Sequence, residues 1–325
     1  MKIDLVYLWV DGNDEKWLAK KNAALVKNDK PPIKRGISDN HWRDNEELKY
    51  SLRSVEKFAP WINHIFIVTD EQSPKWLDVK NPKITIVDLK EYIPNDLLPL
   101  FNSIAIEMFL WNIPGLSEYF IYANDDMFFG KPAEPGFFFD ENRNPITIFK
   151  GRHYTNMRRM STHWNALQTI RKHFGIEYSV SLKHAIEPFR KSYMKESAEK
   201  FYDEIIVPNS TPFRDKQNVK RMIYPLIDNA LGRNTIVMNW RVSKKRIIYD
   251  HKKESAARPV YRKLLWFFAT VFGFIKYDCF DKRQLIVTFL KIYRPTLFCV
   301  NDNGNFDSIS KFLRKMFPDK SCFEL

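Results

Sequence analysis

The sequence has few cysteines, few glycines and no long hydrophobic run. Its three cysteines, Cys279, Cys299 and Cys322, lie far apart without a C-x-x-C pair, which predicts reduced, buried thiols and not a disulfide framework or a metal site. With only 10 glycines and no internal period, the chain is neither a repeat fibre nor disordered. The most apolar stretch, Leu264–Ile275, is shorter than the roughly 20 residues that a membrane-spanning helix needs. These absences favour a globular protein.

Leu264–Ile275 leaves two interpretations open. A stretch of this length is typical of a buried helix, but Arg258, Arg262 and Lys263 precede it, so a helix on an anionic membrane surface is the alternative. At the N-terminus, Asp4 interrupts the apolar run, which predicts a strand and not a signal peptide. Together these features predict a cytoplasmic protein, with peripheral contact at the inner face of the membrane left open.

The chain is strongly basic, and 44% of its residues are hydrophobic, enough for a substantial core. A net charge of +13 indicates an anionic partner, which could be nucleic acid, a phosphorylated substrate or an anionic lipid. The basic clusters Lys244–Arg246 and Lys252–Lys253 are the best support for nucleic acid. Because no nucleic-acid recognition motif accompanies them, a nucleic-acid-binding module is not expected.

Short β-branched and aromatic runs alternate with helical patterns in the first half of the chain. One helix is expected over Asn45–Phe58, with Asp44 or Asn45 as its N-cap, and another over Ser103–Asn112. This alternation is typical of an α/β fold with a mostly parallel sheet flanked by helices. The strands predicted there are Ile3–Val10, His64–Thr69, Ile84–Val87 and Tyr119–Ala123.

The later part of the chain differs in character. The basic segments Leu182–Ile206 and Val219–Leu231 have helical patterns and few strand signals, which predicts a helical insertion. A strand, Leu297–Val300, and an amphipathic helix, Ile309–Phe317, then return to the core. The predicted organisation is an α/β core over residues 1–150, a basic helical insertion over 151–290, and a C-terminal strand and helix over 291–325 that complete the core.

Acidic residues follow the predicted strands. Asp11 follows the first, the pair Asp125-Asp126 follows the fourth, and Asp302 follows the last. Because ligands of open α/β sheets bind at the carboxyl ends of the strands, this row predicts a cation site with a polyphosphate or sugar beside it. Asp70 and Asp88 also follow strands, but their preference for turns explains them better.

Asn124-Asp125-Asp126 is the strongest of these signals. Two carboxylates at a strand end can hold Mg²⁺ or Mn²⁺, and such an ion bridges diphosphate oxygens and neutralises charge on a leaving nucleotide. Because successive strand residues face opposite sides, one aspartate would bind the ion, and the other would support it or contact sugar.

Two further motifs suggest ligand contacts. Asp11 can accept a hydrogen bond from a uracil or ribose, and Gly12 permits a turn that brings the backbone close to a ligand. Trp9, in the strand before them, is expected to pack in the core. Arg43 precedes an expected helix N-terminus, which favours anions, and could clamp a phosphate. Capping explains Asn45 almost as well as ligand binding does.

The remaining candidates lie elsewhere in the sequence. His184 and Arg214 fall in the predicted helical region, where a lone histidine is more often structural than catalytic. Position alone does not set His184 apart from the other histidines. Arg53, within the first predicted helix of the core, fits a solvated residue as well as a ligand contact.

Four motif regions together resemble the Stealth family of hexose-1-phosphate transferases. That family includes bacterial capsular polysaccharide phosphotransferases and the catalytic subunit that makes the lysosomal mannose-6-phosphate tag. The resemblance extends over nearly the whole chain and departs from the family at Glu46, where a small residue is usual, and at Ile186, where a proline is usual. The regions are Asp4–Asp14; Arg43–Ser54 with Ala59–Trp61, Ile67–Asp70, Phe101–Glu107 and Tyr122–Asp126; His184 through Arg214 to Pro225; and Cys299–Asn303 with Phe312–Pro318 and Lys320-Ser321.

The resemblance implies a GT-A-like nucleotide-sugar transferase core with a divalent metal, Mg²⁺ or Mn²⁺, at the acidic strand end. It implies catalytic roles for His184 and Arg214. The role expected of His184 is that of a general base, with positioning of the donor as the alternative, and the role expected of Arg214 is to stabilise charge on the phosphoryl oxygens. Asp125 and Asp126 are the expected catalytic aspartates, and Asp125, Asp126 and Asp302 are the expected metal ligands. The implied donor-binding residues are Asp11, Gly12, Arg43, Asn45, Asn102 and Asn124.

The implied activity is transfer of a sugar-1-phosphate, such as N-acetylhexosamine-1-phosphate, from a UDP-sugar to a hydroxyl of a growing capsular or surface polysaccharide. UMP would be released, and the basic charge suits an anionic oligo- or polysaccharide acceptor. The alternative is an ordinary glycosyltransferase that releases UDP, because the strand-end acids fit both reactions.

Overall fold

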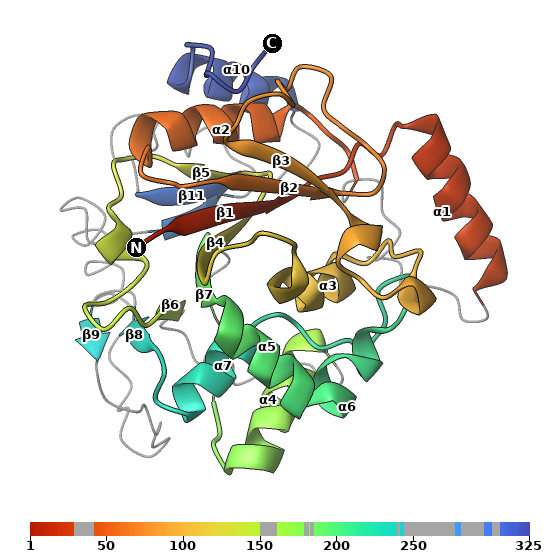
Figure 1. Ribbon diagram of the computed structural model, residues 1–325, viewed down its shortest axis with the longest axis vertical. Helices are drawn as coiled ribbons and strands as arrows, with labels where there is room; N and C mark the ends of the chain where they lie inside the picture. The colour runs from red at the N-terminus through yellow and green to blue at the C-terminus, as the bar shows by residue number, and fades with distance from the viewer. Residues whose placement is uncertain are drawn as a thin grey trace.

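The computed structural model has a central five-stranded sheet in the order β3-β2-β1-β4-β7 (Figure 1). It describes residues 1–28, 42–149, 161–178, 182, 185–238, 241–243, 277–280, 296–300 and 306–325. The strands are β1 (Ile3–Leu8), β2 (Ile65–Thr69), β3 (Ile84–Asp88), β4 (Tyr119–Asn124) and β7 (Glu187–Arg190). The first four run parallel, and β7 is antiparallel to β4.

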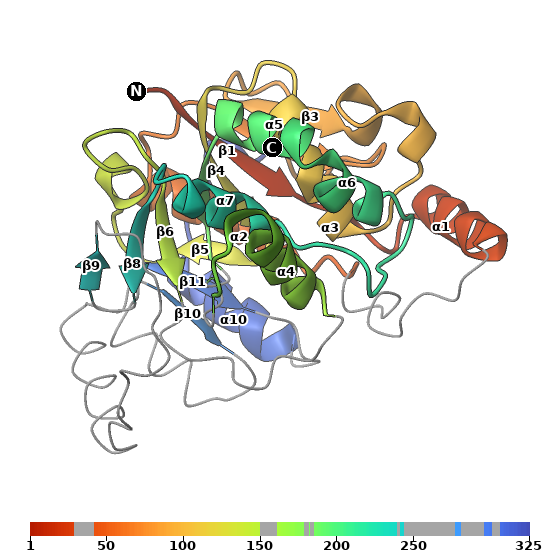
Figure 2. The same ribbon diagram turned by 90° about the horizontal axis from the view of Figure 1, so that it is seen from below.

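Helices cover both faces of this sheet, and two smaller sheets have the orders β10-β11-β5 and β6-β8-β9 (Figures 1 and 2). The remaining strands are β5 (Met127–Phe129), β6 (Ile146–Phe149), β8 (Thr235–Met238), β9 (Arg241–Ser243), β10 (Tyr277–Phe280) and β11 (Leu297–Val300). The α-helices are α1 (Glu15–Lys27), α2 (Glu47–Phe58), α3 (Ser103–Ile106), α4 (Thr162–Phe174), α5 (Lys191–Lys200), α6 (Tyr202–Ile205), α7 (Ile223–Ala230) and α10 (Phe306–Met316). The 3₁₀-helices are η3 (Leu89–Glu91), η4 (Asn95–Leu97), η5 (Glu107–Asn112), η6 (Pro135–Phe137) and η7 (Val207–Asn209). This arrangement confirms the predicted α/β class.

The predicted strands are confirmed because their residues suit a sheet that is buried on both faces. β2 is buried along its whole length, and β1 is buried at all but its last residue. Such strands are continuous apolar runs without alternation. Trp9, directly after β1, is 4% exposed and packs in the core as expected.

α2 lies between the central sheet and α10 (Figure 1). Leu48, Leu52 and Val55 recur at helical spacing and are buried against the central sheet. Tyr50, on another side of the helix, packs in a cluster that includes residues of β5, β11 and α10. Figure 1 shows α10 on the far side of α2 from the central sheet. β11 therefore packs in the same core cluster as β1, through Leu297 and Cys299, whereas α10 packs in the cluster of Tyr50.

The Arg53 side chain ties α2 to the end of the chain. Its Nε and NH2 atoms each donate to a carboxylate oxygen of Glu324 at 2.7 Å, and NH1 donates to the Phe317 carbonyl at 2.8 Å. The Glu324 side chain is 2% exposed and that of Arg53 is 13% exposed. The interpretation of Arg53 as a solvated residue is therefore wrong.

The prediction of a helix over Leu182–Ile206 is wrong in its first part. β7 occupies that part as an edge strand of the central sheet, and α5 and α6 follow it. Pro188 gives the physical reason, because proline disrupts a helix interior but is accepted in an edge strand. The helix predicted over Ser103–Asn112 is instead α3 followed by η5, and the one predicted over Val219–Leu231 is the shorter α7.

Two smaller expectations also need correction. Neither Asp44 nor Asn45 caps α2, because its N-cap is Glu46, which has a left-handed φ of 63° and no side-chain cap bond. Cys322 is an exposed thiol, whereas Cys299 is buried as expected.

Among the described helices, none is both long and apolar enough to cross a membrane. Leu264–Ile275 and the basic clusters at 244–246 and 252–253 lie outside the described residues.

Candidate active site

The parallel strands end at one edge of the central sheet. In the register of the sheet, Leu8 of β1 is opposite Asn124 of β4, and Thr69 of β2 is opposite Asp88 of β3. The residues that follow β1 and β4 therefore start from neighbouring positions on this edge. The predicted positions of Asp11 and of Asp125-Asp126, after neighbouring parallel strands, are confirmed, and their role in binding a cation stays a prediction.

Four acidic side chains gather where β4 ends and α2 begins. Loss of water around Asp125 raises the pKa of its carboxyl well above its usual value, and the charges of Asp126, Glu47 and Asp44 raise it further. Burial and the neighbouring charges of Asp11 and Glu46 also raise the pKa of Asp44. The edge thus concentrates negative charge, which a bound cation would neutralise.

Two residues of β11 donate hydrogen bonds to Asp126. Burial raises the pKa of its carboxyl to about 6, against the lowering effect of a hydrogen bond from Cys299. The Cys299 thiol donates to Asp126 Oδ2 at 3.2 Å, and the Val300 amide donates to the Asp126 carbonyl at 3.0 Å. The other carboxylate oxygen, Oδ1, is buried and has no hydrogen-bond partner among the residues that the structure describes. One oxygen of this carboxylate is therefore available to a ligand.

Glu47 is the member of this cluster that the sequence did not single out. It is 5% exposed, and burial raises the pKa of its carboxyl to about 7. The Asn45 side-chain amide donates to Glu47 Oε1 at 2.8 Å, and the Asn45 backbone amide donates to Oε2 at 2.7 Å. In a sequence, a glutamate in a first helical turn is explained by the helix dipole, so no signal pointed to the site. Asn45, predicted to bind the donor, supports Glu47.

Serines of α2 hold the strand that follows the acidic pair. The Ser51 hydroxyl contacts the Tyr7 hydroxyl at 2.6 Å and donates to the Met127 carbonyl. The Ser54 hydroxyl accepts a hydrogen bond from the Phe129 amide at 3.0 Å. These buried bonds join β1, α2 and β5, so the backbone on both sides of Asp125 and Asp126 is anchored.

The donor set fits a hard divalent cation in part. Oxygen ligands are what Mg²⁺ and Mn²⁺ prefer, and no ion pair joins Asp125 or Asp126 to a lysine or arginine of the described residues. The unpartnered Oδ1 of Asp126 is a ready ligand atom. Among the described residues, however, no three acidic, histidine or cysteine side chains form a complete ligand set. An ion held here would take its other ligands from phosphate oxygens and water, as Mg²⁺ commonly does.

The loop after β1 packs against the start of the α2 segment. The Gly12 amide donates to the Trp42 carbonyl at 2.5 Å, and a Cβ atom on Gly12 would come within 2.3 Å of that oxygen. The structure thus explains glycine at this position by protein packing, whereas the sequence suggested approach to a ligand. The Asp11 carboxylate accepts from the Asn13 amide at 2.9 Å, and it remains partly exposed beside the acidic cluster.

An aromatic cluster brings three predicted site residues together. Trp42, Phe101 and Phe213 are buried with Trp17, and the rings of Phe101 and Phe213 stack with centroids 5.4 Å apart. Each of these three aromatic residues directly precedes a residue singled out from the sequence. Those residues are Arg43, Asn102 and Arg214. The cluster therefore sets the positions of three segments that are far apart in the sequence.

The segment with Arg214 is fixed to the start of α3. Arg214 NH2 donates to the Ser103 hydroxyl at 2.7 Å, and its side chain is partly exposed. Asn102 is fully buried and donates to Asn218 Oδ1 at 3.0 Å. Its Oδ1 accepts from the Ile104 amide at 3.2 Å. Asn102 thus joins α3 to the Arg214 segment, while contact between Asn102 and a donor stays a prediction.

A buried network of charged side chains contacts Asn124 through the Tyr122 hydroxyl. The Tyr122 hydroxyl is 3.0 Å from Glu107 Oε1 and 3.0 Å from Asn124 Oδ1. Arg221 forms ion pairs of 2.9 Å with Glu107 and 3.1 Å with Glu187, and its guanidinium lies over the Tyr122 ring. Burial alone would lower the pKa of Arg221, but Glu107 and Glu187 together raise it above its usual value. The network connects β4 with β7, which begins just after the segment of His184.

Two predicted site residues, His184 and Asp302, lie outside the described residues. Asp70 and Asp88 have the local roles expected of them. Asp70 pairs with Lys20 at 2.6 Å, and Asp88 caps η3.

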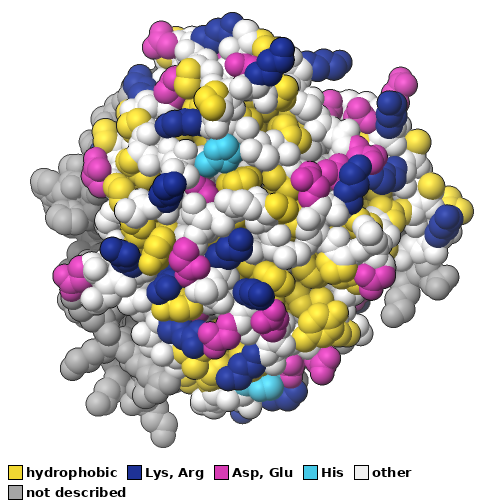
Figure 3. All heavy atoms as spheres, in the orientation of Figure 1, with side chains coloured by type: hydrophobic (Ala, Val, Ile, Leu, Met, Phe, Trp, Pro, Cys, Tyr) yellow, Lys and Arg dark blue, Asp and Glu magenta, His cyan; other side chains and the backbone are white. Residues whose placement is uncertain are grey.

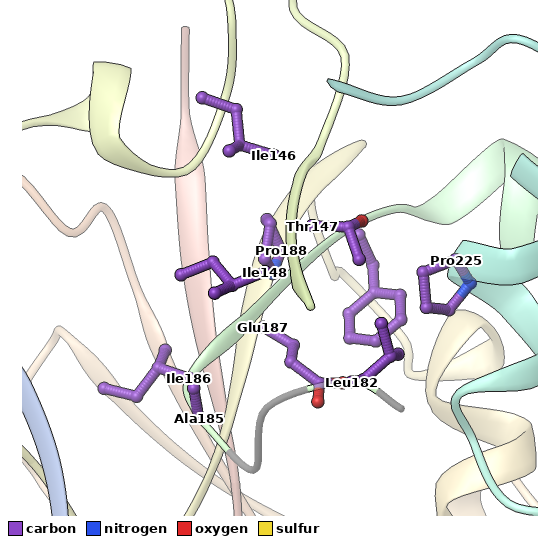
Figure 4. Close-up of a pocket in the computed structure, with 10 residues that line it drawn as sticks. Ile146, Thr147, Ile148, Leu182, Ala185, Ile186, Glu187, Pro188 and Pro225 are labelled. Atoms are coloured by element: carbon purple, nitrogen blue, oxygen red, sulfur yellow. The ribbon is translucent and has the colours of Figure 1, made fainter. Parts of the chain in front are cut away.

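A separate pocket lies between β6 and β7, and Figure 4 shows its lining. Ile146, Ile148 and Phe189 make much of its wall apolar, while Glu187 contributes a carboxylate. None of the four acids of the cluster lines it. On the face drawn in Figure 3, basic and acidic side chains are interspersed, without a patch of one sign.

Family models for the Stealth proteins match two parts of this chain. Conserved region 1 (Stealth protein CR1) matches residues 1–29, and conserved region 2 (Stealth protein CR2) matches residues 41–147. An exopolysaccharide phosphotransferase, cps2G, of Lactiplantibacillus plantarum is 41% identical, with 99% of this chain and 96% of that protein covered. A capsular polysaccharide phosphotransferase, fcs1, of Haemophilus influenzae is 32% identical, with 97% of this chain and 81% of that protein covered.

A solved structure is also similar in part. The galactosyltransferase LgtC, in complex with donor and acceptor sugar analogs, aligns over 96% of both chains with 8% identity and a TM-score of 0.40.

Proposed function

Because this chain belongs to the Stealth family of phosphotransferases, we propose that it transfers a sugar-1-phosphate from a UDP-sugar to a hydroxyl of a surface polysaccharide. The relatives cps2G and fcs1 are named as polysaccharide phosphotransferases, which supports a polysaccharide acceptor. An N-acetylhexosamine-1-phosphate donor group and an anionic acceptor, suited to the charge of +13, complete the proposal.

In the proposed reaction the acceptor hydroxyl oxygen attacks the sugar-proximal phosphorus of the UDP-sugar. A new P–O bond forms, the P–O bond to the bridging oxygen breaks, and UMP leaves with that oxygen. The hydroxyl proton passes to a general base, for which His184 remains the prediction. Because the anomeric C–O bond is not broken, the sugar keeps its configuration.

The acidic cluster supports this chemistry. Asp125 and Asp126 would hold Mg²⁺ or Mn²⁺, which when bound supplies Lewis-acid stabilisation of the diphosphate and of the leaving nucleotide. Asp44 and Glu47 add negative charge around Asp125, and this favours a cation. Arg214, fixed by Ser103, would face the phosphoryl oxygens and stabilise their charge.

The observation that carries the proposal is that Oδ1 of Asp126, within this cluster, is buried without a hydrogen-bond partner from any described residue. A buried carboxylate oxygen without a partner is destabilising, by about 1–3 kcal/mol or more for a charged group, unless a ligand fills the site. Phosphoryl transfer from a nucleotide diphosphate needs a cation at such a place. The carboxylates alone would equally serve a glycosyltransferase, so the product has to decide.

The test is analysis of the by-product with a panel of UDP-sugars and phosphorylated oligosaccharide acceptors. Release of UMP with formation of a phosphodiester, measured by chromatography and ³¹P NMR, is the expected result. Asp70→Asn is a matched control for the loss of a strand-end carboxylate and should still release UMP, because Asp70 pairs with Lys20. UDP as the by-product would overturn the proposal in favour of an ordinary glycosyltransferase.

A further inference from the structure

Cys299 lies against the acidic cluster from a distant part of the chain. It is fully buried in β11, and in the register of the sheet it is opposite Met127, the residue directly after Asp126. Its thiol donates to Asp126 Oδ2 at 3.2 Å across a sequence separation of 173 residues. The fold therefore places a weak hydrogen-bond donor on one of the two oxygens of a predicted metal ligand.

The two oxygens of Asp126 differ in their surroundings. Oδ2 accepts a hydrogen bond from the thiol, whereas Oδ1 is buried and has no partner within the described part of the chain. The Val300 amide also fixes the Asp126 backbone, through its carbonyl at 3.0 Å. With the backbone held, the contact from Cys299 favours the rotation of the carboxylate in which Oδ2 meets the thiol and Oδ1 does not.

The chemistry of a thiol suits this position. An S–H group is a weak donor, so it can orient a carboxylate without withdrawing much of the negative charge that a cation needs. A lysine or arginine at the same place would neutralise the carboxylate and compete with the ion. The same weak contact is compatible with burial, because a reduced cysteine packs as a small hydrophobic residue.

We propose that Cys299 is a positioning residue, whose thiol holds Asp126 Oδ2 and so presents Oδ1 to the divalent cation. This inference rests on the proposed function, which places the ion at Asp125 and Asp126. Cys299 itself does not contact the ion. Partners of this kind orient metal-binding side chains, and their loss commonly weakens metal affinity about 10- to 100-fold.

The test is Mn²⁺ binding to the full-length protein without substrates, measured by electron paramagnetic resonance titration. Cys299→Val fills the volume without a donor, and Cys299→Ala removes both, so each should bind Mn²⁺ about 10-fold more weakly than the wild type. Cys299→Ser keeps a donor and should restore most of the affinity. Cys322→Ala is the matched control, because Cys322 is an exposed thiol.

The outcomes separate the two ideas. Wild-type protein that binds no Mn²⁺ would overturn the metal proposal itself. Wild-type binding with equal affinity in Cys299→Val would overturn only the role of the thiol and leave a packing role. Thermal unfolding of each variant shows which of them fold, and either Cys299→Val or Cys299→Ala is sufficient for the comparison.

Discussion

Replacing Arg53 by alanine should destabilise the protein by about 3 kcal/mol at pH 7. The substitution removes two charge-assisted hydrogen bonds of 2.7 Å to Glu324 and one of 2.8 Å to the Phe317 carbonyl. It also leaves the Glu324 carboxylate, whose side chain is 2% exposed, without its guanidinium. Breaking a buried ion pair from one side costs about 3–5 kcal/mol, and the 13% exposure of Arg53 places the effect at the lower end.

The pair Arg233–Glu196 is a matched control with the same two-point geometry. Its distances are 2.7 and 2.9 Å, but the two side chains are 28% and 48% exposed. Exposed pairs contribute about 0–1 kcal/mol, so Arg233→Ala should cost less than about 1 kcal/mol. In thermal unfolding, a loss of about 3 kcal/mol corresponds to a drop in Tm of about 4 °C for a chain of this size.

The loss of stability caused by Arg53→Ala should be smaller at acidic pH than at neutral pH. Burial alone would raise the pKa of Glu324, but Arg53 and Ser321 lower it below its usual value. A carboxyl whose folded pKa is depressed stabilises the fold above its unfolded pKa, about 4.3, and that stabilisation is lost as the pH falls through the folded pKa. The difference in free energy of unfolding between wild type and Arg53→Ala should therefore become smaller below about pH 4.

Urea denaturation of wild type, Arg53→Ala and Arg233→Ala at several pH values measures these differences. An Arg53→Met/Glu324→Leu double variant should recover part of the loss, because no buried charge is left unpaired. If Arg53→Ala cost no more than Arg233→Ala, or if its cost were the same at pH 3.5 and pH 7, the reasoning from burial would be refuted.

Three further predictions concern the site and the core. Asp125→Asn and Asp126→Asn should each lower turnover by more than about 100-fold. Neither should lower the Tm of the metal-free protein, because burial destabilises both charged carboxylates, and a clear drop in Tm would contradict this. Because the pKa of Asp126 is about 6, protons should compete with Mn²⁺, so affinity measured by titration should fall as the pH drops from 7 to 5; a flat profile would contradict a ligand role. Tyr92→Phe should stabilise the protein by about 1 kcal/mol in urea denaturation, because the buried Tyr92 hydroxyl has no partner among the described residues; a loss of stability would point to a contact outside them.

The central sheet could be predicted from the sequence because its information is local. Runs such as those of β2 and β4 are apolar and β-branched or aromatic, and turn residues bound them. The position of the acids at one edge then follows from parallel topology alone. β7 could not be read in this way, because a strand of four residues at a sheet edge depends on its partner β4 more than on its own pattern.

The supports of the site could not be predicted, because they act across long separations. No local pattern relates Cys299 to Asp126 or Ser51 to the Met127 carbonyl. The sequence shows that Gly12 is a glycine in a turn, but its contact with the Trp42 carbonyl depends on how a distant segment packs. Sequence reasoning thus found residues that carry charge and missed many of those that hold them in place.

β11, which supports Asp126, is synthesised on the ribosome well after the strands of the central sheet. All five strands of the central sheet precede residue 191, so the sheet can form while the rest of the chain is still being translated. Asp126 receives the Cys299 thiol and the Val300 amide only after more than a hundred further residues have been added. Prematurely terminated chains would therefore present a formed sheet with an unsupported carboxylate. We expect such nascent products to remain inactive towards the donor.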